Sequence, residues 1–342
     1  WDQALREISE KVNDIRSRHG NDAVAGYLGN PAAFGTLHPM AFHGFMLGLG
    51  TTNVYSSASQ DLTNKYLVAQ RMYGVPLLQP IPDLDRTRFV MLFGTNPHIS
   101  QMSVVQAPKA THRLKAIVER GGRVVHVNPR RTETARAVGE QVFIRPGTDV
   151  FLLASFLQEL LAGDHVDHDL VRRHTVGFGA LPAVVAGWTP ERTAEVTGVP
   201  AEVLRELVAA YAAADGAVLY SSTGVNMGPH GTLAYWFLNV INAVSGNLDR
   251  RGGTLVGEGV IDFARFGVRT GTLMADDTSR IGGIRKVNDA YPGGVLADEI
   301  LTPGPGQVKA LFVTGGNPLI TMADAGRLRE AFGQLELLVT LD

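Results

Sequence analysis

Four short turns in this sequence combine residue types that suit the binding of a phosphate group. Each follows an apolar run and contains Asn-Pro: Gly29-Asn30-Pro31, Gly94-Thr95-Asn96-Pro97, Asn128-Pro129 and Gly315-Gly316-Asn317-Pro318. Glycine lets the backbone approach a ligand closely, asparagine caps a helix, and proline fits the first helical position. The free N–H groups at a helix N-terminus attract anions. One such turn would indicate only a helix start, but four of them favour a ligand that carries phosphate.

These turns follow predicted β-strands in an alternating pattern of strands and helices. Apolar runs predict strands at 23–28, 89–93, 124–127, 142–145, 217–220, 310–313 and 337–341. Apolar segments at 150–161 and 232–244 predict buried helices between them. Such alternation is typical of parallel sheets flanked by helices, which bind ligands at the carboxyl ends of their strands. From about 261 to 307 the periodicity fades, which predicts a long functional or disordered loop.

One further turn, Pro146-Gly147-Thr148-Asp149, precedes the apolar segment 150–161. Asp149 can cap that helix through its carboxylate. The same carboxylate can accept two N–H donors from the edge of a guanine base. The local sequence leaves both interpretations open.

Composition excludes several classes of protein. The 342 residues, 45% hydrophobic and 19% charged, are typical of a folded protein with about two domains. The net charge of −2 disfavours nucleic acid as a partner. No apolar run reaches the roughly 18 residues of a membrane span, so we expect no direct membrane insertion. The absence of cysteine excludes disulfides, thiolate zinc sites and iron–sulfur ligation from these residues.

The longest motif carries a resemblance to a known family. The run Gly121 to Ala135, followed by Ile144 to Asp149, resembles the molybdopterin oxidoreductases of the dimethyl sulfoxide reductase type. Supporting motifs stand in the family's order at 93–97, 224–226, 246–248 and 315–318. The resemblance implies a bis(molybdopterin guanine dinucleotide) cofactor around molybdenum or tungsten, and an enzyme of two-electron redox chemistry or oxygen-atom transfer. The alternative is a non-catalytic relative with a structural or electron-relay role, like the large subunits of complex I.

The resemblance also implies a domain plan. We expect two Rossmann-like α/β domains related by pseudo-symmetry, each with a mostly parallel sheet and each binding one pterin guanine dinucleotide. Residues 1–60 and 217–342 would form a discontinuous domain, with 61–216 inserted as the second. The family adds an N-terminal domain with a [4Fe–4S] cluster and a C-terminal domain, both of which we expect outside these 342 residues. The chain by itself would then lack the cofactor and be inactive.

The expected partners are a small-molecule substrate, the missing domains of the same polypeptide and an electron-transfer subunit, with no nucleic acid. We expect a cytoplasmic protein, or a periplasmic one if a signal precedes residue 1. The substrate, the direction of the reaction and the choice of metal stay open.

Cofactor contacts transfer from the family to positions in the turns. For Thr223 only the backbone contact transfers, and Arg130 is favoured over Arg131 for charge-assisted hydrogen bonds to a pyrophosphate. The full set is Gly94, Thr95, Asn96, His98, Ser100, Asn128, Arg130, Arg131, Pro146, Gly147, Thr148, Asp149, Thr223, Gly224, Asn226, Gly316 and Asn317.

The metal ligand of the family, which is also its catalytic position, is Cys, selenocysteine, Ser or Asp on a loop before a helix. Counting from Asn53-Val54 places it at Asp61, and a shift of two residues would place it at Ser59. Asp61 can instead cap a helix that starts at Leu62. Formate dehydrogenases carry His where Leu62 stands, which disfavours formate as the substrate. We assign His38, His43 and His230 to structural or surface roles.

Overall fold

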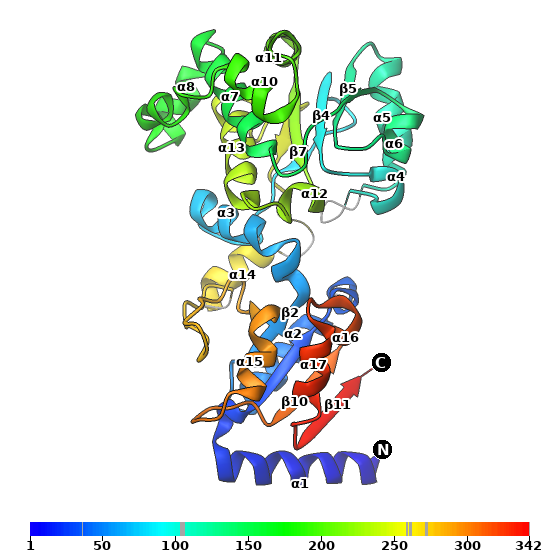
Figure 1. Ribbon diagram of the computed structural model, residues 1–342, viewed down its shortest axis with the longest axis vertical. Helices are drawn as coiled ribbons and strands as arrows, with labels where there is room; N and C mark the ends of the chain where they lie inside the picture. Colours follow the sequence, from blue (N-terminus) through cyan, green and yellow to red (C-terminus); the bar gives the residue numbers. More distant parts are fainter. Residues whose placement is uncertain (36, 103–106, 258, 260–261, 271–272, 342) are drawn as a thin grey trace. The chain divides into compact units, whose positions relative to one another are not determined.

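The computed structural model describes residues 1–35, 37–102, 107–257, 259, 262–270 and 273–341 (Figure 1). The chain divides into two compact units. Unit 1 contains Trp1–Leu77 and Phe263–Asp342, and unit 2 contains Leu78–Asp262. Unit 1 is therefore discontinuous in sequence, and unit 2 is inserted between its two parts.

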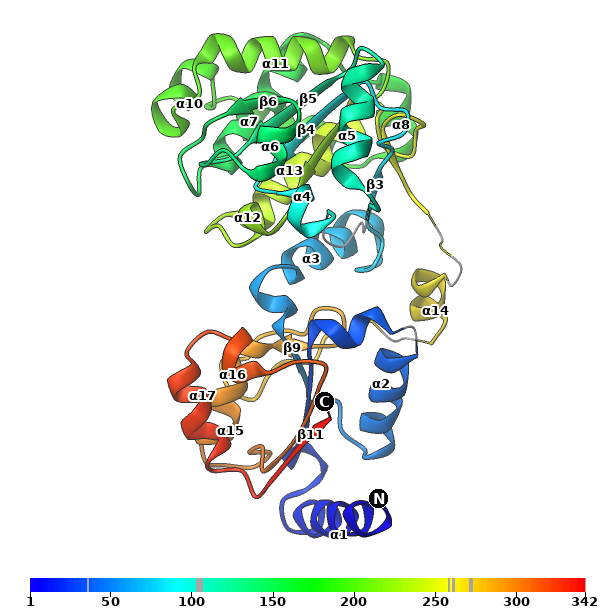
Figure 2. The same cartoon turned by 90° about the vertical axis from the view of Figure 1, so that its right-hand side faces the viewer.

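Unit 1 is built on a parallel five-stranded sheet in the order β11-β10-β1-β2-β9. Val12 and Ile15 of α1 and Phe42 and Met46 of α2 pack in one hydrophobic core. Helices α15 and α17 contribute to a second core, and Figure 2 shows them across the sheet from α2. The strands are β1 (Val24–Leu28), β2 (Val54–Ser56), β9 (Tyr291–Pro292), β10 (Ala310–Thr314) and β11 (Leu337–Leu341).

The helices of unit 1 are α1 (Asp2–His19), η1 (Asn21–Ala23), η2 (Asn30–Phe34), α2 (His38–Gly48), η3 (Ser57–Gln60), α3 (Thr63–Tyr73), α14 (Phe263–Thr270), η5 (Gly293–Val295), α15 (Leu296–Leu301), α16 (Pro318–Thr321) and α17 (Ala325–Phe332).

Unit 2 is built on a parallel four-stranded sheet in the order β6-β5-β4-β7. All five residues of β4 are buried, as expected for a strand covered on both faces. Leu114 and Ile117 of α5 pack in the core on one face, while α11 and α13 pack against β7. The strands are β3 (Ile81–Pro82), β4 (Phe89–Phe93), β5 (Arg123–Val127), β6 (Glu140–Val142), β7 (Ala217–Ser221) and β8 (Thr254–Leu255), of which β3 and β8 form a separate antiparallel pair.

The helices of unit 2 are α4 (Pro97–Ser100), α5 (Ala110–Glu119), α6 (Glu133–Ala137), α7 (Asp149–Ala162), α8 (His168–His174), η4 (Phe178–Ala180), α9 (Leu181–Val185), α10 (Pro190–Thr197), α11 (Ala201–Ala213), α12 (Thr223–Asn226) and α13 (Gly231–Val244).

The α/β class and the parallel sheets flanked by helices are confirmed. The expected domain boundaries at 60/61 and 216/217 differ from the division of the structure at 77/78 and 262/263. Strand β7 pairs along its whole length with β4, with Phe89 opposite Ala217, and α13 packs against α7. These long-range contacts place residues 217–262 in unit 2.

Two local expectations were also wrong. Strand β6 ends at Val142, so residues 143–145 are not part of it. The segment expected as a loop from 261 to 307 contains α14, β9 and α15. Leu296 and Ile300 of α15 are fully buried, and this burial orders the segment. Its positions 261, 271 and 272 lie outside the described residues.

Candidate functional site

The two loops at the switch point of the unit 2 sheet touch each other. The chain leads from β4 to β5 and β6 on one side, while β7 lies on the other side. The Gly224 N–H donates a hydrogen bond to the Gly94 carbonyl oxygen at 3.0 Å. A Cβ on Gly94 would lie 2.7 Å from the Val225 nitrogen, and one on Gly224 would lie 2.6 Å from the Gly94 oxygen. Both positions therefore need glycine, and the crevice where such sheets bind ligands is lined by bare backbone.

Unit 1 has an equivalent arrangement between β1 and β10. The Gly29 N–H donates to the Thr314 carbonyl at 2.9 Å. A Cβ on Gly29 would lie 2.1 Å from the Gly315 oxygen, and one on Gly316 would lie 3.2 Å from the Gly29 Cα. The predicted Gly316 thus lies at this switch point, with Asn317 as the N-cap of α16. Gly29 was not among the expected cofactor contacts, although its Gly-Asn-Pro turn shares the Asn-Pro pattern of the other three turns.

Asn96 joins the loop after β4 to the start of α6. Its Oδ1 accepts hydrogen bonds from the Thr134 N–H at 3.2 Å and hydroxyl at 2.7 Å. Its Nδ2 donates to Glu133 Oε2 at 2.6 Å. The His98 N–H donates to the Thr134 hydroxyl at 2.9 Å. The Asn96 side chain therefore holds two loops together, and its polar atoms already have partners within the protein.

Arg130 and Arg131 differ in their contacts. Arg130 pairs with Glu133 at 3.2 Å, and hydrogen bonds from Arg130 and Asn96 lower the pKa of Glu133 to about 2. No ion pair or hydrogen bond of the exposed Arg131 side chain is present within the described residues. Arg131 is thus the more available guanidinium, contrary to the preference for Arg130.

Other predicted residues of unit 2 surround the same edge of the sheet. Thr95 is buried, and its hydroxyl has no partner within the described part of the chain. Asn128 Oδ1 accepts the Arg130 N–H at 3.3 Å. The Ser100 hydroxyl donates to the Asn96 carbonyl within its own helical turn, at 3.3 Å. The sequence analysis missed Ser222, whose N–H donates to the Phe93 carbonyl at 3.2 Å and so fixes the turn of Thr223 and Asn226.

Asp149 is the first residue of α7 and is only 9% exposed. The N-cap of α7 is Thr148, with no side-chain cap bond. No described residue other than Asp149 itself donates a hydrogen bond to the carboxylate. Burial raises the pKa of Asp149 to about 6, against an ordinary value of 3.8. The preceding Pro146 and Gly147 form the turn, with Gly147 at a φ of +76°. The structure thus gives Asp149 a buried carboxylate that receives no hydrogen bond from another described residue.

Asp61 follows η3 and is exposed. Helix α3 begins at Thr63 with Leu62 as its N-cap, so Asp61 lies one residue too early to cap it. Desolvation raises the pKa of Asp61, and the charge of Lys65 lowers it. The Ser59 hydroxyl donates to the Ser56 carbonyl at 3.2 Å and accepts the Gly293 N–H at 3.0 Å. The Ser59 hydroxyl therefore links η3 to the start of η5, the helical turn that follows β9.

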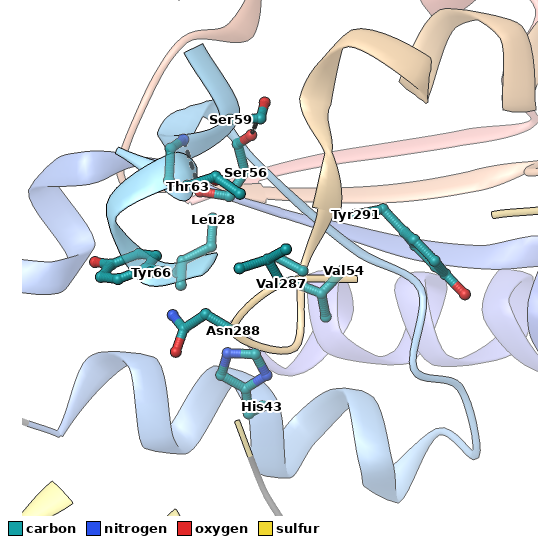
Figure 3. A pocket seen from close by; sticks show the side chains of 12 residues that line it. Leu28, His43, Val54, Ser56, Ser59, Thr63, Tyr66, Val287, Asn288 and Tyr291 are labelled. Carbon is teal, nitrogen blue, oxygen red and sulfur yellow. Dashed lines mark hydrogen bonds between the residues drawn. The ribbon is translucent and has the colours of Figure 1, made fainter. Parts of the chain in front are cut away.

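A small cavity of about 50 Å³ lies in unit 1 beside η3 (Figure 3). His43 of α2, Ser59, Thr63 and Tyr66 line it, together with Asn288. His43 was assigned to structure or surface in the sequence analysis, and nothing in its local sequence distinguishes it.

The other two histidines have structural neighbours. His38 Nε2 lies 2.8 Å from the Thr314 hydroxyl, and His230 packs edge-on against Phe151. Across the described ranges no three His, Cys, Asp or Glu side chains lie together as a metal site. Within those ranges no helix is long and apolar enough to cross a membrane.

The sequence model of the family described as molybdopterin oxidoreductase matches residues 1–342. The chain belongs to the molybdopterin oxidoreductase family. Among molybdopterin oxidoreductases it resembles the molybdopterin-containing subunit of thiosulfate reductase from Salmonella typhimurium, with 27% identity covering 100% of this chain and 46% of that protein. It is 26% identical to formate dehydrogenase H of Escherichia coli, over 100% of this chain and 49% of that protein. The chain spans about half the length of the curated relatives it matches.

A solved structure shares the fold of this chain. Acetylene hydratase from Pelobacter acetylenicus matches with a TM-score of 0.80 and 21% sequence identity, covering 100% of this chain and 50% of that one. At this identity the likeness shows the fold alone.

Proposed function

We propose that this chain is the cofactor-binding core of a molybdenum or tungsten oxidoreductase, and that each α/β unit binds one guanosine diphosphate arm of a bis-pterin cofactor. Membership of the molybdopterin oxidoreductase family supports the proposal. So does the pair of glycine-lined switch points, one in each unit, because backbone at such points binds phosphate groups.

The observation that carries the proposal is the buried carboxylate of Asp149. A carboxylate with 9% exposure whose one donor is its own backbone N–H is unfavourable in its charged form unless a ligand supplies further hydrogen bonds. The Watson–Crick edge of guanine offers an N1–H and a 2-amino group, two donors that match the two carboxylate oxygens. The residues therefore fit the guanine end of the cofactor.

The remaining contacts follow from the same edge of the sheet. The buried Thr95 hydroxyl and the backbone around Gly94 and Gly224 would hold phosphate oxygens, with Arg131 supplying charge. Arg130 would orient the loop through Glu133 and Asn96. In unit 1 the turn at Gly316 would bind the second guanosine diphosphate arm.

Asp61 would be the protein ligand of the metal. A carboxylate is a hard oxygen ligand and suits an oxidised metal of this kind. When bound, the metal supplies two-electron redox chemistry, often with transfer of an oxygen atom. The residues of this chain bind the nucleotide arms, position them and exclude water around them.

Nucleotide binding tests the proposal directly. Guanosine diphosphate is titrated by calorimetry into the 342-residue chain, in parallel with inosine diphosphate, which lacks the 2-amino group. Asp149→Asn should lower the affinity for guanosine diphosphate by about 10–100-fold, the loss expected when a charged hydrogen-bonding partner is removed. The same variant should gain affinity for xanthosine diphosphate, because its amide can donate to the xanthine 2-oxygen.

Asp169→Asn, on the exposed surface of α8, is the matched control and should bind all three nucleotides as the wild type does. Equal binding of guanosine and inosine diphosphate, unchanged by Asp149→Asn, would remove the basis of the proposal. Metal and pterin analysis of the complete protein, expected to find molybdenum or tungsten, separates an enzyme from a non-catalytic relative.

A further inference from the structure

The cavity in unit 1 presents a hydrogen-bond acceptor that the protein leaves unused. The Oδ1 atom of Asn288 is buried and has no partner within the described residues. Figure 3 shows the Asn288 side chain between His43 and Tyr66 at the cavity. A buried acceptor without a donor costs free energy, so a water molecule or a ligand in the cavity must supply the donor.

The backbone that carries Asn288 is itself unusual. Asn288 and Asp289 are both left-handed, with φ of 54° and 56°. They form the tip of a two-residue turn closed by Val287 and Ala290, whose backbone hydrogen bonds measure 3.1 and 3.3 Å. Two successive left-handed residues form a type I′ turn, a conformation that asparagine and aspartate adopt more readily than most other residues. Asp289 anchors the turn, since its Oδ1 accepts the Ala275 N–H at 3.1 Å.

The lining of the cavity combines polar and apolar side chains and is uncharged. Among the described residues around it there is no Asp, Glu, Lys or Arg. Burial lowers the pKa of His43, which the charge of Asp289 raises and that of Lys286 lowers. Burial also raises the pKa of Tyr66 to about 12, with a further contribution from Asp61. At neutral pH the residues that line the cavity therefore include a neutral imidazole, two phenols, three hydroxyls and a carboxamide.

The volume limits the ligand. A cavity of about 150 Å³ holds benzene, whose six carbon atoms take about 25 Å³ each. The 50 Å³ of this cavity therefore suit about two non-hydrogen atoms at the end of a ligand. An anion of that size would find no cation here, whereas an uncharged molecule with one polar hydrogen and one acceptor oxygen would satisfy both sides.

We propose that this cavity recognises the reacting end of a small uncharged substrate, an alcohol or a carboxamide, whose polar hydrogen is accepted by Asn288 Oδ1 and whose oxygen accepts a hydrogen bond from His43. Calling it a substrate site rests on the proposed function, because Ser59 at its wall lies two residues from Asp61. The binding itself depends only on the residues of unit 1.

Formamide and formate provide the test, since they have the same size but only formamide is neutral and donates N–H groups. Each is titrated into the full 342-residue chain without metal or nucleotide. Binding is followed by the NMR signals of the His43 ring nitrogens and the Asn288 side-chain amide. We expect saturable millimolar binding of formamide. Formate should bind about tenfold more weakly, because it has no N–H to donate to the buried Asn288 Oδ1.

Asn288→Gly removes the acceptor and suits the left-handed backbone, so it should fold with undiminished thermal stability while formamide binds about tenfold more weakly. Lys109→Gly is the control, because Lys109 also has a left-handed φ, of 55°, but belongs to unit 2 and does not line the cavity. This variant should bind formamide as the wild type does.

Three results would overturn the proposal: no binding of formamide, formate binding as tightly as formamide, or unchanged formamide binding in Asn288→Gly. Failure of the Asp149-dependent binding of guanosine diphosphate would instead contradict the proposed function, since Asp149 belongs to unit 2 and the cavity residues belong to unit 1.

Discussion

The Gly224 N–H donates to the Gly94 carbonyl oxygen at 3.0 Å, and this bond joins the loops that follow the two strands of the unit 2 switch point. No side chain separates the loops, so their backbone groups stay accessible at the carboxyl edge of the sheet. Any side chain added at this point would push the loops apart.

Gly224→Ala should destabilise the protein by about 1–3 kcal/mol, the usual result of forcing a methyl group into packed backbone. The added Cβ would meet the Gly94 oxygen at 2.6 Å. Urea unfolding measures the change in the free energy of unfolding. Gly179→Ala is the control, because nothing lies within 4 Å of a Cβ there. An equal loss of stability in both variants would show that the contact with the Gly94 oxygen is not the cause.

Asp149→Asn should stabilise the chain at neutral pH. The pKa of Asp149 is raised from 3.8 to about 6 in the folded state, so the favourable contribution of its neutral form is complete below pH 3.8 and is lost as the pH rises through 6. A shift of about two units at 1.36 kcal/mol each corresponds to a penalty of about 3 kcal/mol at pH 7.

Chemical denaturation of Asp149→Asn and wild type at pH 4 and pH 7 measures this penalty. The variant should exceed the wild type in stability at pH 7 and match it near pH 4. Asp169→Asn, with its exposed side chain, should show no such pH-dependent gain. A loss of stability at pH 7 would mean that the Asp149 carboxylate has a donor in the folded chain.

His126 should make the protein less stable in mild acid. Its Nε2 lies 2.9 Å from the Val138 carbonyl, and its buried Nδ1 has no partner in the described part of the chain. Burial lowers the pKa of His126, and the bond to Val138 raises it less. The unfolded chain therefore takes up a proton below about pH 6.5 that the folded chain resists, and stability falls as the pH drops.

His126→Gln removes this titration, so its stability should fall less than that of the wild type between pH 7.5 and pH 5.5 in guanidinium unfolding. His112→Gln, on the exposed side of α5, should follow the wild type. An equal loss of stability on acidification in His126→Gln and in the wild type would show that the folded state does not resist protonation of His126.

Asp61→Asn tests the metal ligand in the complete, cofactor-loaded protein. If Asp61 is the ligand, turnover should fall by orders of magnitude and X-ray absorption should show altered coordination of the metal, because an anionic ligand sets its charge and geometry. Stability should change little, since Asp61 precedes the N-cap of α3.

Ser59→Ala is the comparison for Asp61→Asn. It removes the acceptor of the Gly293 N–H and should cost about 1 kcal/mol of stability while the metal spectrum stays unchanged. The opposite pattern, with an altered metal spectrum only in Ser59→Ala, would identify Ser59 as the metal ligand.

Local sequence patterns determined the strands and the glycine turns of this protein. The run 89–93 is apolar at every position and folds as a fully buried strand, because five successive apolar residues are stable only where both faces are covered. Gly94 directly follows this strand and Gly315 directly follows β10, and both adopt the left-handed backbone that glycine favours, with φ of 56° and 64°. These features depend on neighbours in the sequence.

Tertiary structure decided what depends on distant residues. The assignment of 217–262 to unit 2 follows from the pairing of β7 with β4, which no local pattern encodes. Similarly, the weakly periodic segment before Gln307 is ordered because Glu299 is buried against Arg280 at 3.0 Å. The cavity joins His43 with Asn288, more than two hundred positions apart in the sequence. Only the fold could bring these side chains together, since burial and pairing are properties of the packed chain.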